Sequence, residues 1–538
     1  MPKILINEVD NTSAGTPGRY GNYAVLLAGL KGTPAVDDKK WQKPDENGVY
    51  EFSSAQAFKD TIGLAEAGAS HAGNRMAYEL LNLGYQVIYK VIENVSDMAD
   101  EDFWAVFKDK ASYDFRFISH GLLASETDAT YNTLCDKRAA MEADLQILKD
   151  IEIAAGIDDK HETFTVAEVK ACDDIFAERL AEGNFGNFAS EAVYAAKYSY
   201  YHTAAGLSET EGGKKDLNAG VAGDLADVID SINEADSKSF TVGVYNKINS
   251  NIAKIASYRV NESDGTVYCN GRGDCVALIE LDEKAYVDTA SKDRPEALII
   301  NGIKRMSASI GEEGAYCALT VPSVHYVIGE GTEKFPAAFH YLACFMSSIS
   351  SGFAEWYAAA GYNRGVSSYV IDHTSVKLGE IAINALEPRN IENQETQPPF
   401  ACNVIANFRG SYYLWGNRTA AQLGEKAGGD DLTAKHFLNI RQLCSTIKKQ
   451  LYVACRRFTF DPNSDTLWFN FVNAITPTLD AMKADQGIRD YKIVKVFTNK
   501  KATLKARVRI IPIEAVEDFD ITISLEDSFG GVSVTAEG

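Results

Sequence analysis

The stretch that decides the fold is the last quarter of the chain. It reads YYLWGNRTA at residues 412–420, FLNIRQLCSTIKKQL at 437–451, FDPNSDTLW at 460–468 and KARVRIIPIEAVEDFDITISL at 505–525. This order predicts a turn, a basic amphipathic helix, a second helix that starts after Pro-Asn, and then strands.

The first of these helices is predicted over residues 433–456, because its apolar residues recur every three or four positions. The apolar stripe consists of Phe437, Ile440, Cys444, Ile447, Leu451 and Ala454. The residues that lie off the stripe and form a predicted basic face are Lys435, Arg441, Lys448 and Lys449. A solvated helix surface and a docking surface for an acidic partner both explain such a face.

The second helix is predicted to start at Asp465 as N-cap and to end at Gly487. Its apolar face consists of Leu467, Trp468, Phe471, Ile475, Leu479 and Met482. Strands are predicted at 491–497 and 502–513. In the second strand Lys505, Arg507 and Arg509 alternate with apolar residues, which places these three cations on one sheet face.

Charge is unevenly distributed over the 538 residues, whose formal net charge is −22. Residues 432–511 hold 15 Lys and Arg against 5 Asp, a net of +10, which leaves −32 for the rest. This asymmetry predicts contact with an acidic partner or with another copy of the chain. No nucleic-acid motif accompanies it, so no direct nucleic-acid contact is expected.

The remaining composition is ordinary for a globular protein, with 46% hydrophobic and 24% charged residues. No apolar run of about 18 residues predicts a membrane span. The nine cysteines include no CxxC pair, so we expect reduced, buried thiols and folding in a cytoplasm.

The predicted fold class is α+β or α/β multidomain. Strand and helix patterns alternate before residue 128, the segment from 128 to 236 is acidic and helical, and strand patterns return at 274–281 and 297–301. The expected divisions are a linking arm at 1–20, a core at 21–127 and 237–398, a helical, outward-facing insertion at 128–236, a C-terminal domain at 399–517, and a second arm at 518–538.

Both arms carry a strand pattern at an end of the sequence. The apolar positions are Ile4, Ile6 and Val9 in the first arm and Phe519, Ile521, Ile523 and Leu525 in the second. An unpaired strand of this kind is an aggregation liability. Donation to a neighbouring subunit and pairing within the same chain both solve this problem.

Four segments resemble contractile phage tail sheath proteins of the large-myovirus type, in the order that this family shows them. They are the N-terminal arm with the strand at 24–29 and FSSAQAFKDTIG at 52–63, CNGRGDCVALIELDE at 269–283, WYAAAGYNRG at 356–365, and residues 408–525. The motif residues are Gly361, Asn363, Arg364, Gly365, Trp415, Gly416 and Arg418. Ala359 stands where the family loop usually has Pro.

The resemblance implies a structural protein with no cofactor, metal site or catalytic residue. Sheath subunits polymerise as stacked six-fold rings around a tail tube, and contraction drives the tube through the host envelope. Terminal arms link the subunits, and a helix of the C-terminal domain faces the tube, which makes Lys435, Arg441, Lys448 and Lys449 the expected tube-facing residues. The implied partners are the chain itself, the tube protein, the baseplate and the tail terminator. The implied location is the virion, after assembly in the host cytoplasm.

Three alternatives stay open at this point. The sheath of a headless contractile injection particle has the same sequence features. An enzyme is disfavoured because the sequence has no HExxH, GxSxG or GxxxxGK[ST] motif, and Asp372-His373 is a weak signal by itself. An adhesion module is suggested only by the tripeptide Arg272-Gly273-Asp274.

Overall fold

The computed structural model describes residues 23–30, 42–64, 72–122, 244–260, 267–287, 294–386, 401–421, 433–498 and 502–515, apart from single positions within these ranges. The insertion predicted at 128–236 and both predicted arms lie outside the described residues. In the described part, none of the helices has the length and apolar composition that a membrane crossing requires.

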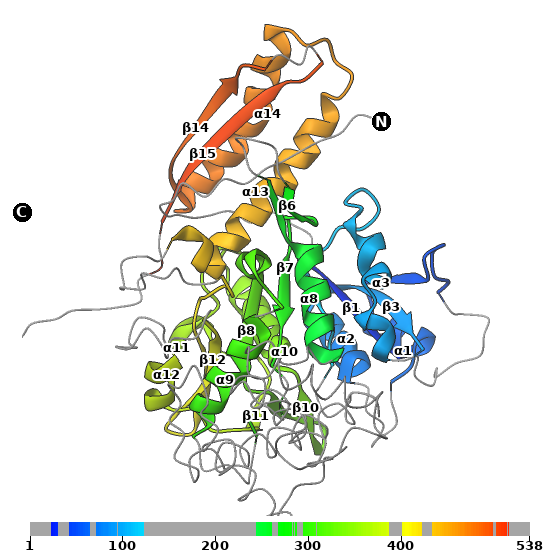
Figure 1. Ribbon diagram of the computed structural model, residues 1–538, viewed down its shortest axis with the longest axis vertical. Helices are drawn as coiled ribbons and strands as arrows, with labels where there is room; N and C mark the ends of the chain where they lie inside the picture. Colours follow the sequence, from blue (N-terminus) through cyan, green and yellow to red (C-terminus); the bar gives the residue numbers. More distant parts are fainter. Residues whose placement is uncertain are drawn as a thin grey trace, which may run out of the picture.

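An eight-stranded sheet forms the body of the molecule, in the order β13-β12-β8-β7-β4-β1-β3-β2 (Figure 1). The six inner strands run parallel, whereas β2 and β13 are antiparallel edges. The strands are β1 (Ala24–Leu30), β2 (Val49–Phe52), β3 (Gln86–Ile92), β4 (Phe117–Ser119), β7 (Val276–Ile279), β8 (Cys317–Val321), β12 (Asn403–Phe408) and β13 (Ser411–Trp415).

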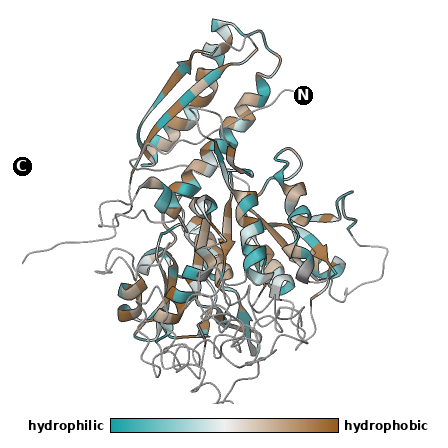
Figure 2. Cartoon of the chain, viewed as in Figure 1, coloured by the Kyte–Doolittle hydropathy of each residue, from teal (hydrophilic) through white to brown (hydrophobic). Residues whose placement is uncertain are grey.

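The inner strands are apolar on both faces because helices cover both sides of the sheet. In β1, Leu26 belongs to one core cluster and its neighbours Val25 and Leu27 belong to the other. Hydrophobic residues accordingly run along the central strands (Figure 2). This three-layer arrangement confirms the predicted α/β class.

One core contains α3 (Glu101–Ala105), α8 (Val244–Ala256), α9 (Pro295–Ser307) and α12 (Glu380–Leu386). The other contains α1 (Ala55–Thr61), α2 (Ala72–Asn82) and α10 (Ala337–Ser350). The short helix α11 (Gly361–Arg364) contacts α10 and β13. Two smaller sheets complete the body: β10 (Gly331–Phe335), β9 (Val324–Ile328) and β11 (Ile371–Thr374), and the pair β5 (Tyr258–Val260) and β6 (Val267–Asn270).

The C-terminal unit consists of α13 (Leu438–Arg457), α14 (Asp465–Ala484), β14 (Ile488–Val496) and β15 (Lys505–Pro512). It projects from one end of the body, and α13 runs from the body into the projection (Figure 1). A small core joins the two parts, in which Trp356 of the body packs with Ile447 of α13 and Leu479 of α14.

Three sequence expectations need correction. Residues 297–301 were expected as a strand but lie in α9, where Ile299, Ile303 and Met306 follow helical spacing and are buried. The N-cap of α14 is Ser464, whose hydroxyl accepts from the Leu467 N–H at 3.3 Å, and not Asp465. The body sheet also extends past the boundary expected at residue 398, because β12 pairs in parallel with β8.

Candidate assembly interface

The turn before α13 holds that helix to the edge of the body sheet. Gly416 has φ of 144°, and a Cβ there would lie 2.9 Å from the Asn403 Cα. The Asn403 side chain accepts from the Arg418 N–H at 2.8 Å and donates to the Arg418 carbonyl at 2.9 Å. The Arg418 guanidinium lies 4.8 Å from the Phe437 ring. The motif residues Gly416 and Arg418 therefore build a rigid entry to α13.

Asn417 extends this entry to the first turn of the helix. Its carbonyl accepts from the Leu438 N–H at 3.0 Å, and its side-chain oxygen accepts from the Asn439 N–H at 3.0 Å. The first N–H groups of a helix have no partner within the helix. Asn417 supplies two of those partners.

The loop at 356–365 packs against the same strand. The Gly365 carbonyl accepts from the Leu414 N–H at 2.8 Å, and a Cβ at Gly365 would lie 2.4 Å from the Leu414 carbonyl. Arg364 donates to the Ala358 carbonyl at 2.8 Å and lies over the Phe353 ring. This loop therefore covers part of the edge of β13.

The other motif residues of this region face outward to different degrees. Gly361 opens α11 with φ of 79°, and Asn363 is exposed. Trp415 is half-buried, with its ring 5.2 Å from Tyr362 and 5.0 Å from Phe408.

The predicted basic face of α13 is not a free surface. Arg441 and Lys448 are buried, with 4% and 6% exposure, and both lie over the Tyr316 ring of the body. Lys448 also donates to the Gly273 carbonyl at 2.8 Å. In the first half of α13, these two polar-side residues therefore pack against the body and do not face solvent.

The other two residues of that set differ from each other. Lys449 pairs with Asp114 and lies 3.9 Å from Asp274, with 11% of its side chain exposed. Lys435 lies in a short 3-10 turn before α13 and is half-buried. The structure therefore gives three of the four cations a partner within the chain.

The turn that receives α13 is the tripeptide Arg272-Gly273-Asp274. Arg272 donates to Asp274 at 3.0 Å and to the carbonyls of Phe107 and Tyr113, at 3.1 and 2.7 Å. Burial alone raises the pKa of Asp274, but the charges of Arg272, Lys449 and Lys110 outweigh it and hold that pKa at about 2. Both charged residues of the tripeptide are buried, so it is not available for adhesion.

Another buried cation, Arg116, joins the body to α13 and was not anticipated from sequence. Its guanidinium donates to Gln442 at 3.2 Å and to Thr446 at 2.9 Å. It also lies 3.9 Å from the buried Glu355, which accepts from the Tyr23 hydroxyl at 3.2 Å. The only sequence signal is an Arg within an apolar run at 115–118, which indicates a buried, paired charge.

The β14–β15 hairpin carries the exposed positive charge. Its inner face packs on the helices through Tyr491, Ile493, Val508 and Ile510. Lys492 and Arg509 are paired across the strands on the outer face, and Lys505 lies on the same face. All three are exposed, while Arg507 between them is half-buried. The period-two prediction for β15 is confirmed.

The hairpin has open edges within the described part of the chain. There β14 pairs with β15 alone, so one edge of each strand has no strand partner. A long two-stranded sheet with free edges is a template for further strands. The apolar positions of the two predicted arms lie outside the described residues, so their pairing stays a prediction. These positions are Ile4, Ile6, Val9, Phe519, Ile521, Ile523 and Leu525.

The Asp372-His373 pair singled out in the sequence lies within the described residues. His373 Nδ1 lies 2.8 Å from a carboxylate oxygen of Asp372, and the His373 ring stacks on that of His325. The Asp372-His373 pair is exposed, on β11. No group of three His, Cys, Asp or Glu side chains in the described ranges is spaced to hold a metal ion. Seven cysteines are described, and all are free thiols.

The chain is similar to two solved structures at low sequence identity. The anti-feeding prophage (AFP) baseplate, 6-fold symmetrised, matches with 10% identity and a TM-score of 0.48, over 98% of this chain and 99% of that one. The PVC sheath complex of an extracellular contractile injection system, in the contracted state, matches with 10% identity and a TM-score of 0.47, over 98% of both chains. No family model and no curated protein matches the sequence.

Proposed function

We propose that the chain is the subunit of a contractile sheath, which polymerises around a tube and contracts to drive that tube through a host envelope. The observation that carries this proposal is the β14–β15 hairpin. It is a strand template with free edges in the described chain, and buried polar contacts of α13 fix its unit to the body. The chain's own two arms have the alternating pattern that such a template accepts.

In this assembly the arms of neighbouring copies add to the hairpin edges, so that subunits stay linked while they rotate. Contacts of this type are heterologous and build an open helix rather than a closed dimer. The expected organisation is stacked six-fold rings, with baseplate and terminator proteins at the two ends. The segment 128–236 is expected to lie on the outside of the sheath.

The tube-facing surface follows from where charge is left exposed. Lys435 keeps this role as a half-buried cation, and the outer hairpin face adds Lys492, Lys505 and Arg509. In the free subunit α13 is anchored to the body by Arg441, Lys448 and Lys449. They reach a tube only if those contacts open on assembly.

Electron microscopy of the purified chain tests the proposal directly. Tubes or stacked rings are the expected result, and a monomer at all concentrations contradicts it. Deletion of residues 1–18 or of 518–538 should leave a soluble, folded monomer that forms no tubes. Normal polymerisation of either deletion variant would show that the deleted arm is not a linker. Micrographs of the native particle distinguish a phage tail from a headless particle.

A further inference from the structure

The tip of the C-terminal unit presents an aromatic side chain in a strained conformation. Phe460 lies in the turn between α13 and α14, has φ of 79°, and is 87% exposed. A bulky residue at positive φ is an outlier that costs free energy. An exposed phenyl ring returns none of that cost in the free subunit, so its use must be sought in a contact.

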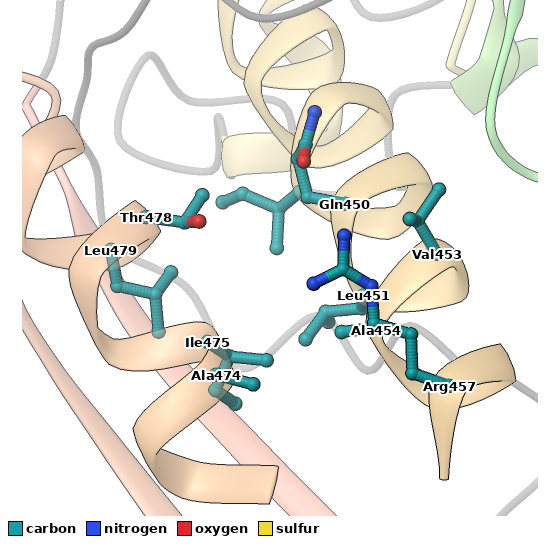
Figure 3. A pocket seen from close by; sticks show the side chains of 10 residues that line it. Gln450, Leu451, Val453, Ala454, Arg457, Ala474, Ile475, Thr478 and Leu479 are labelled. Atoms are coloured by element: carbon teal, nitrogen blue, oxygen red, sulfur yellow. The ribbon is translucent and has the colours of Figure 1, made fainter. Parts of the chain in front are cut away.

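A groove between α13 and α14 has the size of such a ring. It has a volume of about 160 Å³, and side chains from both helices converge on it (Figure 3). Its apolar lining includes Leu451, Ala454, Ile475 and Leu479. A cavity of about 150 Å³ is large enough to bind benzene. The groove is therefore large enough for one phenyl group.

The charges beside the ring and beside the groove are complementary. Asp461 follows Phe460 and is exposed, and Arg457 lines the groove and is also exposed. Neither side chain makes an ion pair with another described residue. A phenyl ring in the groove would bring the neighbouring carboxylate toward this guanidinium, and such a pair at a rim adds specificity more than affinity.

We propose that Phe460 of one copy inserts into the α13–α14 groove of a second copy. The same chain carries both halves, and Phe460 does not line its own groove. One knob and one groove on each copy give a heterologous contact that continues from subunit to subunit. The inference rests on the proposed sheath function and identifies an additional contact between neighbouring subunits, separate from the arms.

Photo-cross-linking of the full-length protein tests whether this contact forms. Phe460 is replaced by the photoreactive p-benzoylphenylalanine, and equal amounts of ¹⁴N- and ¹⁵N-labelled protein are mixed before irradiation. We expect cross-links from position 460 to residues of α13 or α14, joining one light and one heavy chain. Cross-links within one chain, to another surface, or none at all would overturn the proposal.

Two variants disable the two halves separately. Phe460→Asn removes the ring but keeps a residue that tolerates positive φ, so the Tm of the monomer should stay unchanged or rise. Ala474→Trp fills the groove from an exposed position on α14. Burial of a Phe side chain is worth roughly ten- to a hundredfold in affinity, so each variant should need at least about tenfold more protein to polymerise.

Phe469→Gln is the matched control, because Phe469 is an exposed aromatic of the same unit that does not line the groove. It should polymerise like wild type. Wild-type-like polymerisation of Phe460→Asn, or an equal defect in the control, would show that the ring has no specific site. If the wild-type protein itself never polymerises, the sheath function is wrong. The cross-link in concentrated solution then still decides the contact.

Discussion

The first half of α13 and the β14–β15 hairpin carry the same kind of charge and use it in opposite ways. In α13, Arg441 and Lys448 are buried against the body, where both lie over the Tyr316 ring and Lys448 donates to the Gly273 carbonyl. In the hairpin, Lys492 and Arg509 face solvent side by side. Both regions are basic in sequence, but the cations of the first are buried against the body and those of the second are exposed to solvent.

The difference follows from the cost of removing a charge from water. A buried cation must be paired or hydrogen-bonded, and the body supplies carbonyls, rings and carboxylates at the places where α13 enters. Because these contacts form within the folded subunit, their free energy stabilises the fold. Exposed cations of the hairpin contribute little to folding, so their placement is free to serve assembly.

The largest expected effect comes from the turn that receives α13. Arg272→Ala should lower the free energy of unfolding by roughly 3–5 kcal/mol, because it leaves Asp274 buried without its nearest cation. Urea denaturation measures the loss, with the exposed Lys492→Ala as control. A loss below about 1 kcal/mol in Arg272→Ala would show that the turn is not an anchor.

A smaller loss is expected at the helix side of the same contact. Lys448→Met should cost roughly 1–3 kcal/mol, because the Gly273 carbonyl loses its donor while the apolar stem is retained. The sequence alone predicted that reversing Lys448 and Lys449 to Glu leaves melting nearly unchanged. The burial of Lys448 predicts instead that this double variant melts at a lower temperature, which differential scanning calorimetry would detect.

The elements of the fold were predictable where local pattern and burial agree. The helix α14 and the alternation of β15 follow from spacing alone, since one side of each packs inward. The burial of the polar side in the first half of α13 was not predictable. The residues that contact Lys448 and Lys449 lie more than 150 positions earlier in sequence. Amphipathic spacing distinguishes two sides of a helix but does not reveal whether water or protein covers the polar side.

Local sequence pattern was also insufficient at the edge of the body sheet and at the tip of the C-terminal unit. Residues 403–408 have a strand pattern, but which sheet they join depends on pairing with β8, more than 80 positions away. No sequence pattern singles out Phe460, because its exposure depends on a backbone conformation that Phe rarely adopts. Long-range pairing and backbone strain are the two properties that the sequence pattern does not contain.

A pH titration sharpens the contrast between buried and exposed groups. Burial lowers the pKa of His120 to about 4, although its hydrogen bond with Asn249 opposes the shift. Below about pH 6.5 the unfolded chain binds a proton that the folded chain excludes, so stability falls as pH decreases toward 4. At pH 5.5 this residue alone should cost about 1.4 kcal/mol.

Denaturation curves between pH 7.5 and 5.5 measure this dependence. His120→Gln keeps a side-chain donor for Asn249 but cannot titrate, so its curve should be flatter than that of wild type by about 1.4 kcal/mol at pH 5.5. Parallel curves for the two proteins would show that His120 does not carry the pH dependence.

The smallest effect on folding, and the sharpest test of the contrast, is expected at the outer hairpin face. Reversing Lys492, Lys505 and Arg509 to Glu should change the free energy of unfolding by less than about 0.5 kcal/mol per site, because all three are exposed. Loading onto the tube should nevertheless fail, since every subunit then presents acid to the surface that these cations are proposed to contact. Each lost contact is worth only about 0.2–1 kcal/mol, but the loss is repeated along the polymer. Co-sedimentation of the protein with its tube at increasing NaCl provides the measurement, and loading of the wild type should weaken with salt because the Debye length is about 8 Å at physiological ionic strength. The matched control reverses Lys247, Lys304 and Lys377, three exposed lysines of the body, and should load like wild type. Equal failure of this control would mean that net charge, and not the hairpin face, governs loading.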